Sequence, residues 1–179
     1  MISITDAQQD MREAYFGGAP GAVSSATTWL IAALVVTLVD PMSGIWTLVL
    51  GGMLIFPVSL LLCKVLGRTG KQSKENPLGS LAIEGTIWMI LGIVIAIGVA
   101  FHKLEWFFPA MLLVIGGRYF TFSTLYGMKL YWAFGATLVI AAFALWAFKA
   151  PVLSGAWTGA VIEYAFGLAI FAGIGTKTR

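Results

Sequence analysis

The chain has 179 residues, of which 59% are hydrophobic and only 11% are charged. A soluble domain carries ~25% charged residues, so the composition excludes a soluble protein and makes the lipid bilayer the surrounding solvent. The net charge of +3 is small and accompanies neither a basic run nor a nucleic-acid-binding motif, which argues against nucleic acid as a partner.

Motifs for catalysis and metal binding are scarce. Cys63 is the one cysteine and His102 the one histidine, which removes intrachain disulfides, cysteine clusters and most transition-metal sites. The sequence contains no GxSxG, HExxH or CxxC motif. We therefore expect no catalytic residue, no metal and no cofactor, and the sequence does not favour an enzyme.

Residues 1–21 are predicted to form a cytoplasmic N-terminal segment with a short amphipathic helix, because they lack the basic start and apolar run of a signal peptide. The helix is expected over 3–16, with Thr5 and Gln8 as a capping box. Ile4, Ala7, Met11 and Ala14 fall near one face, so the helix could lie on the membrane surface or serve only as a lead-in.

Six apolar stretches follow, each long enough to cross the bilayer. The predicted fold class is all-α, a polytopic membrane protein with a bundle of six transmembrane helices. The expected spans are about 22–39, 44–62, 78–101, 106–127, 130–148 and 152–174. Proline at position 57 should kink the second span.

Similar strings recur along the spans. LVLGGMLIF at 48–56 resembles LVIGGRYFT at 113–121, which favours a helical hairpin repeated in parallel. Chance similarity among apolar strings is an equal alternative. An inverted repeat of three helices has less support, from Ile83-Glu84 and Ile162-Glu163.

The distribution of lysine and arginine predicts the orientation. Six spans put both termini on one side, together with eight basic residues, whereas the other side receives only Lys103 and Lys149. The eight are Arg12, Lys64, Arg68, Lys71, Lys74, Lys129, Lys177 and Arg179. The positive-inside rule then places both termini in the cytoplasm.

Three charged residues lie inside the predicted spans. Glu84 is ~9 Å from the cytoplasmic start of its span, and Arg118 is ~14 Å from the cytoplasmic end of the next, so we expect these two to pair. Glu163, near the middle of the last span, is the other candidate partner of Arg118, and two acids with one base leave one acid over. Hydroxyl groups and deep tryptophans are expected at this depth. The predicted ligand-binding residues are Glu84, Arg118, Glu163, Trp29, Trp88, Tyr119, Tyr164 and Thr28.

A purely structural interpretation stands beside the functional one. A Glu84–Arg118 ion pair could fix helix register without binding anything, and hydroxyl groups commonly bond across helices. The pairs Gly51-Gly52 and Gly116-Gly117 are expected to serve helix packing rather than ligand binding.

Three strings resemble a family of uncharacterised bacterial integral membrane proteins: AYFGGAPGAVSS (14–25), NPLGSLAIEGTIWMILG (76–92) and EWFFPAMLLVIGGRYFTFSTLYGMKLYW (105–132). The resemblance covers about residues 10–170. It implies a bacterial plasma-membrane location and no particular activity. A fainter likeness, resting on the repeat pattern alone, is to acid-resistance membrane proteins built from two-helix hairpins, and the charged interior departs from it.

The sequence favours binding or transport of a small, cationic or protonatable solute through a polar cavity open to the cytoplasm, in a homo-oligomer within the lipid bilayer. The alternatives are a structural or stress-related membrane protein without transport, and a lipid-binding protein whose hydroxyl-rich half receives a head group.

Overall fold

The computed structural model describes residues 2–175, and this part of the chain contains helices and no strand. Six segments are long and apolar enough to cross a membrane. The predicted all-α class with six spans is therefore confirmed. The α-helices are α1 (Ile4–Tyr15), α2 (Ala19–Leu38), α3 (Pro41–Val65), α4 (Leu78–His102), α5 (Phe107–Tyr126), α6 (Leu130–Ala147) and α7 (Val152–Gly175).

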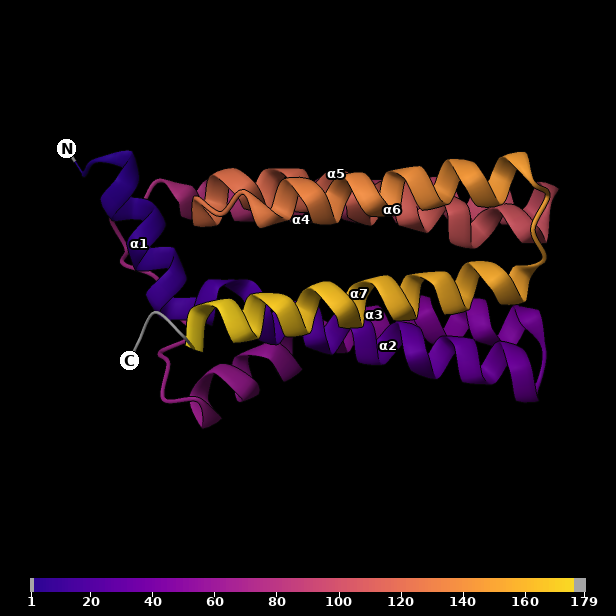
Figure 1. Ribbon diagram of the computed structural model, residues 1–179, viewed down its shortest axis with the longest axis horizontal. Coiled ribbons are helices and arrows are strands. Elements are labelled where there is room, and N and C mark those ends of the chain that lie inside the picture. The colour runs from indigo at the N-terminus through magenta and orange to yellow at the C-terminus, as the bar shows by residue number, and fades with distance from the viewer. Residues whose placement is uncertain (1, 176–179) are drawn as a thin grey trace.

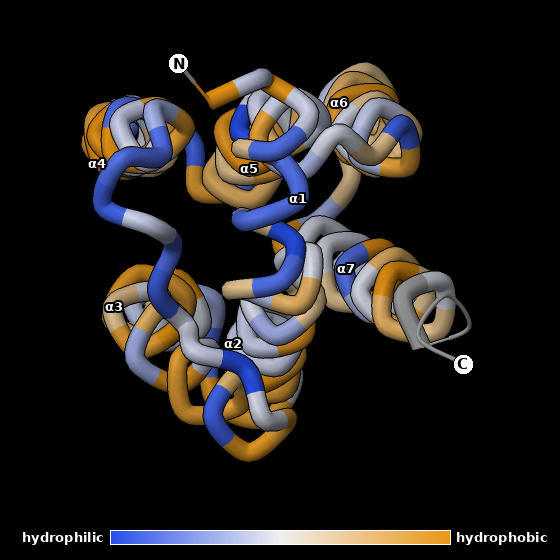
Figure 2. Tube along the Cα trace, turned by 90° about the vertical axis from the view of Figure 1, so that its left-hand side faces the viewer, coloured by the Kyte–Doolittle hydropathy of each residue, from blue (hydrophilic) through white to orange (hydrophobic). Residues whose placement is uncertain are grey.

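The spans form two layers of three helices. α2 packs against both α3 and α7, and α5 packs against both α4 and α6. The view along the bundle shows α4, α5 and α6 in one row and α3, α2 and α7 in the other (Figure 2). The central helices α2 and α5 are accordingly among the most buried spans, whereas α3 and α4 are the least buried.

The two layers have matching arrangements with opposite chain directions. Consecutive spans alternate in direction between the two ends of the bundle (Figure 1). The layer α7-α2-α3 therefore has the arrangement of α4-α5-α6 with every helix reversed. Two of the expected hairpins, α2–α3 and α4–α5, are packed pairs, but α6 and α7 lie in different layers and contact each other less. The packing thus favours the inverted arrangement over three equivalent hairpins.

α1 lies across the end of the bundle where the chain begins (Figure 1). Its N-cap is Ser3, whose hydroxyl accepts from the Asp6 backbone N–H at 3.1 Å, and not Thr5 as the capping-box pattern predicted. Ala7, Met11 and Ala14 of the expected apolar face are buried, whereas Ile4 is 56% exposed. Arg12 donates to the carbonyl of Tyr126 at 2.6 Å, so α1 caps the C-terminal end of α5.

A short 3-10 segment, η1 (Phe16–Gly18), turns the chain from α1 into α2, and a second, η2 (Leu104–Trp106), precedes α5. Phe16 and Gly18 have φ angles of 50° and 84°, in the left-handed region that favours glycine. A side chain at Gly18 would also collide with the rings of Tyr126 and Tyr131. Gly17 and Gly18 therefore serve a tight, buried turn.

The exposed surface of the spans is mainly apolar, which suits contact with lipid. Met53 on α3 and Trp88 on α4 are 71% and 74% exposed. α3 also carries Pro57 within the helix, and the last part of α3 diverges from α2 (Figure 1). Proline removes a backbone donor and clashes with the preceding turn, which accounts for this divergence.

Candidate functional site between the two layers

The centre of the site is Glu163 of α7, whose side chain is completely buried. The Tyr119 hydroxyl of α5 donates to Glu163 Oε2 at 3.2 Å. Glu163 Oε1 has no hydrogen-bond partner among the described residues, although Ser25 of α2 lies beside the carboxyl group. A buried carboxyl oxygen without a partner is costly, so this atom is a site where a donor would bind favourably.

Small residues bring the neighbouring helices close to Glu163. Gly155, Gly159 and Gly167 stand at four-residue spacing from it on one face of α7. A Cβ at Gly159 would collide with the Trp29 ring of α2, and one at Gly155 would lie 2.7 Å from Phe108 Cβ of α5. The glycines thus allow α2 and α5 to approach α7 closely, which presents Glu163 to both.

Aromatic rings hold Tyr119 in place. Its ring stacks on Phe134 with centroids 3.8 Å apart and lies 5.8 Å from the Tyr131 ring, while Phe122 contacts it edge-on at 5.5 Å. Phe134 in turn stacks on Phe166 of α7 at 4.6 Å. Of these aromatic residues, only Tyr119 was predicted from the sequence as a site residue. The three- and four-residue spacing of aromatic residues in 119–126 was a signal that could have revealed it.

Arg118 neighbours Tyr119 but points elsewhere. Its guanidinium donates to Thr86 Oγ1 at 3.2 Å and Met89 Sδ at 2.7 Å on α4, and it lies 5.3 Å from the Phe122 ring centre. Within the described part of the chain, no carboxylate oxygen lies within 4.0 Å of it. Arg118 and Glu163 interact electrostatically across a longer distance.

The expected Glu84–Arg118 ion pair is wrong. Glu84 is exposed on α4, whereas Arg118 contacts Thr86, two residues further along. Residues two apart on a helix do not share a face, so the face that meets Arg118 turns Glu84 outward. Depth along the helix was estimated well enough, but the rotation of α4 about its axis was not predictable from depth.

The two tryptophans predicted as ligand-binding residues, Trp29 and Trp88, are separated in the structure. Trp29 is fully buried, its ring lies 5.7 Å from Phe108, and its indole N–H has no partner among the described residues. Trp88 shares the exposed face of Glu84 and points away from the bundle. Only Trp29, one turn from Ser25, belongs to the neighbourhood of Glu163.

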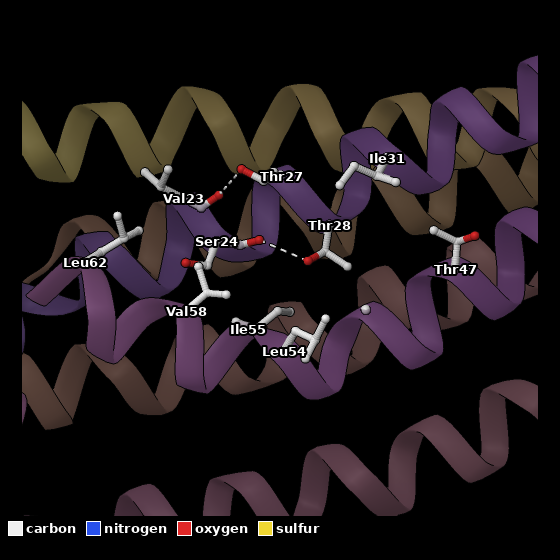
Figure 3. Close-up of a pocket in the computed structure, with 11 residues that line it drawn as sticks. Val23, Ser24, Thr27, Thr28, Ile31, Thr47, Leu54, Ile55, Val58 and Leu62 are labelled. Atoms are coloured by element: carbon white, nitrogen blue, oxygen red, sulfur yellow. Dashed lines mark hydrogen bonds between the residues drawn. The ribbon is translucent and has the colours of Figure 1, made fainter.

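The hydroxyl groups of α2 do not surround Glu163 as a polar cavity. Thr28 donates to the Ser24 carbonyl at 3.1 Å, and the Thr27 and Tyr164 hydroxyls are 2.9 Å apart. Thr28 instead lines a pocket of ≈ 230 Å³ between α2 and α3, whose other walls are mainly apolar (Figure 3). This pocket includes neither Glu163 nor Arg118.

The structure thus brings together Glu163 and Tyr119, with Arg118 and Trp29 nearby, and leaves Glu84, Trp88, Thr28 and Tyr164 outside this group. No curated protein and no solved structure matches the chain. One family matches residues 4–173, nearly the whole chain, and its function is unknown. The chain therefore belongs to the family of unknown function DUF7010.

Proposed function

We propose that the protein binds a small protonatable or cationic solute inside the membrane and moves it across, with Glu163 as the binding carboxyl. The observation that carries this proposal is the fully buried Glu163, whose Oε1 lacks a partner among the described residues. Ionisable residues within membrane spans are expensive and are typical of ion and proton pathways.

The position of Glu163 at the layer interface supports movement as well as binding. Glu163 belongs to the layer α7-α2-α3, and Tyr119 belongs to the layer α4-α5-α6. In transporters with inverted repeats, the substrate site lies at the interface of the two halves, which rock against each other. A donor that replaces the Tyr119 hydrogen bond would alter the contact between the layers.

A proton and a cation compete for the same carboxyl group in this proposal. We also propose that the protein resides in the plasma membrane as a homo-oligomer with both termini in the cytoplasm. This orientation is supported by the basic residues of α1, of the α3–α4 connection and of the α5–α6 turn, which lie at one end of the bundle (Figure 1). Two further basic residues assigned to the cytoplasm, Lys177 and Arg179, lie outside the described residues. Arg118 is not counted because it lies within a span.

The test is the thermal stability of the purified protein against a panel of amines at two pH values. A bound solute stabilises the native state according to its affinity. We expect an amine to raise the melting temperature more at the higher pH, and Glu163→Gln to abolish the effect. Glu105→Gln, which removes an exposed acid outside the bundle, is the matched control. An amine effect that survives Glu163→Gln would refute the proposal.

A further inference from the structure

The two layers carry one acid and one base near their interface that are not paired with each other, and the base, Arg118, now extends toward α4 within its own layer. Glu163 lies on α7, and Arg118 lies on α5 in the opposite layer. They interact electrostatically but are not within 4.0 Å. Tyr119 stands between them, adjacent to Arg118 in sequence and hydrogen-bonded to Glu163. Each charge therefore lies inside the bilayer region without an ionic partner among the described residues.

The present hydrogen-bond partners of Arg118 are weak for a partly buried cation. A thioether sulfur is a poor acceptor, and Thr86 supplies a single neutral hydroxyl. The planar guanidinium is suited to a carboxylate, which it can bind through two parallel hydrogen bonds. Glu163 Oε1, in contrast, makes no hydrogen bond to the described residues and has only the neutral Ser25 hydroxyl beside the carboxyl group, whereas a protonated amine would supply a charged donor.

We propose that the solute is a zwitterion, an amino-acid-like molecule whose ammonium group binds Glu163 and whose carboxylate binds Arg118. This inference rests on the proposed function and specifies its substrate class. A zwitterion neutralises both buried charges at once, whereas an amine leaves Arg118 uncompensated and an acid leaves Glu163 uncompensated. The ammonium donates N–H groups, so a quaternary ammonium compound is a poorer fit to Oε1.

The zwitterion also links the two layers. Its two charged groups bind residues on opposite layers, so the bound molecule holds α5 and α7 together through contacts that neither half-molecule can make alone. The Tyr119 hydroxyl now donates to Glu163 across the layers. When the ammonium group binds, it can keep this hydrogen bond or be replaced by an ammonium N–H as the donor to Glu163. The Phe122 ring lies 5.3 Å from the Arg118 guanidinium and contacts the Tyr119 ring edge-on, so apolar ring surface adjoins both charged groups.

The experiment compares each zwitterion with its two half-molecules on the full chain in detergent. Alanine is matched with ethylamine and propionate, and leucine with isopentylamine and 4-methylpentanoate. We expect at least one zwitterion to stabilise the wild type with an affinity about tenfold above both of its half-molecules, as a charge-assisted hydrogen bond contributes. Arg118→Gln should reduce the zwitterion to the affinity of its amine, and Glu163→Gln to that of its acid.

Controls and contrary outcomes separate this inference from the proposed function. Lys129→Gln and Glu105→Gln remove exposed charges at the helix ends and should leave the ligand order unchanged. An amine that binds as well as its zwitterion, regardless of Arg118→Gln, overturns the zwitterion and keeps the proposed function. Failure of every probe, or binding that ignores Glu163→Gln, overturns both. If Arg118→Gln does not fold, the affinities of the zwitterion, its amine and its acid are compared on wild type and on Arg118→Lys. A zwitterion that binds the wild type no more tightly than its amine then overturns the inference.

Discussion

At the scale of single residues, the Tyr119 hydroxyl is the group that satisfies Glu163. Removing it with Tyr119→Phe leaves Glu163 Oε2 without its donor while keeping the ring that stacks on Phe134. We expect a loss of about 1 kcal/mol, within the range for a hydrogen bond between membrane helices. Thermal denaturation of the purified protein measures this.

The matched control is Tyr164→Phe, because its hydroxyl bonds to Thr27 at the exposed edge of the α2–α7 contact. We expect Tyr164→Phe to lower the stability less than Tyr119→Phe, because the remaining Thr27 hydroxyl is exposed and does not become a buried polar group without a partner. If Tyr119→Phe and Tyr164→Phe lower the stability equally, burial of the Glu163–Tyr119 hydrogen bond adds nothing to its contribution.

Gly159 is the second residue on which the site depends. A Cβ at this position would collide with the Trp29 ring, which is itself enclosed. We expect Gly159→Ala to destabilise the protein by about 1–3 kcal/mol, the usual effect of overpacking. Gly117→Ala is the control, because nothing lies within 4 Å of a Cβ there, and alanine favours the helix. If both substitutions are tolerated alike in thermal unfolding, the close α2–α7 approach is not needed.

The same residues show how much of the site the sequence could predict. Glu163, Tyr119, Arg118 and Trp29 were identified from residue type and depth, and they do lie near one another. Glu84 and Trp88 were assigned to the interior, yet they face outward. From Met89 to Phe101, α4 consists only of apolar residues and glycine, so this part of its sequence does not indicate which face meets a neighbour.

At the scale of elements, the start of α3 is fixed by a titratable cap. Asp40 accepts from the Ser43 backbone N–H at 2.9 Å, and also from the Ser43 hydroxyl. These hydrogen bonds hold the pKa of Asp40 below its usual value. A carboxyl group with a lowered pKa in the folded state stabilises the fold above its unfolded pKa, and this contribution disappears as the pH falls through the folded value.

We therefore expect Asp40→Ala to lower the melting temperature at pH 7 and to have a smaller effect at an acidic pH below the lowered pKa of Asp40, where the wild type has lost the ionised cap. Asp40→Asn should keep most of the stability at pH 7, since asparagine is also a good N-cap, and should remove the Asp40 part of the acid sensitivity. An Asp40→Ala effect that is the same at both pH values would contradict the role of the charge.

The elements themselves were largely predictable, and their partners were not. Apolar run length and turn residues indicated each span, because both are local properties of the chain. The assignment of α7 to the layer of α2 depends on the contact of Trp29 with Gly159, and no local pattern reports a contact between the first and last spans. The Pro57 divergence, a local effect, was predicted.

At the scale of the whole molecule, the proposed orientation makes a simple prediction. The native Cys63 is buried, with 2% exposure, so it should react poorly with a membrane-impermeant maleimide. Lys71 and Lys149 are exposed at opposite ends of the bundle and can each be replaced by cysteine. We expect Lys149→Cys to be labelled on intact cells, and Lys71→Cys only after permeabilisation, because the basic end faces the cytoplasm.

Wild-type protein with Cys63 alone provides the background. The opposite labelling pattern would reverse the proposed orientation, and labelling of both positions on intact cells would mean that the population inserts in both directions.

The packing of α2 against α7 has a consequence for how the protein is made. The ribosome synthesises α2 first among the spans and α7 last. The contact between Trp29 and Gly159 can therefore form only when synthesis of the spans is nearly complete. Meanwhile α2 must tolerate lipid on its future contact face, and its hydroxyls at Ser24, Thr27 and Thr28 do so by bonding to carbonyls of their own helix. The bundle is closed only by its final helix, which is also the helix that delivers Glu163, so the nascent chain carries no buried acid until its apolar partners are already in place.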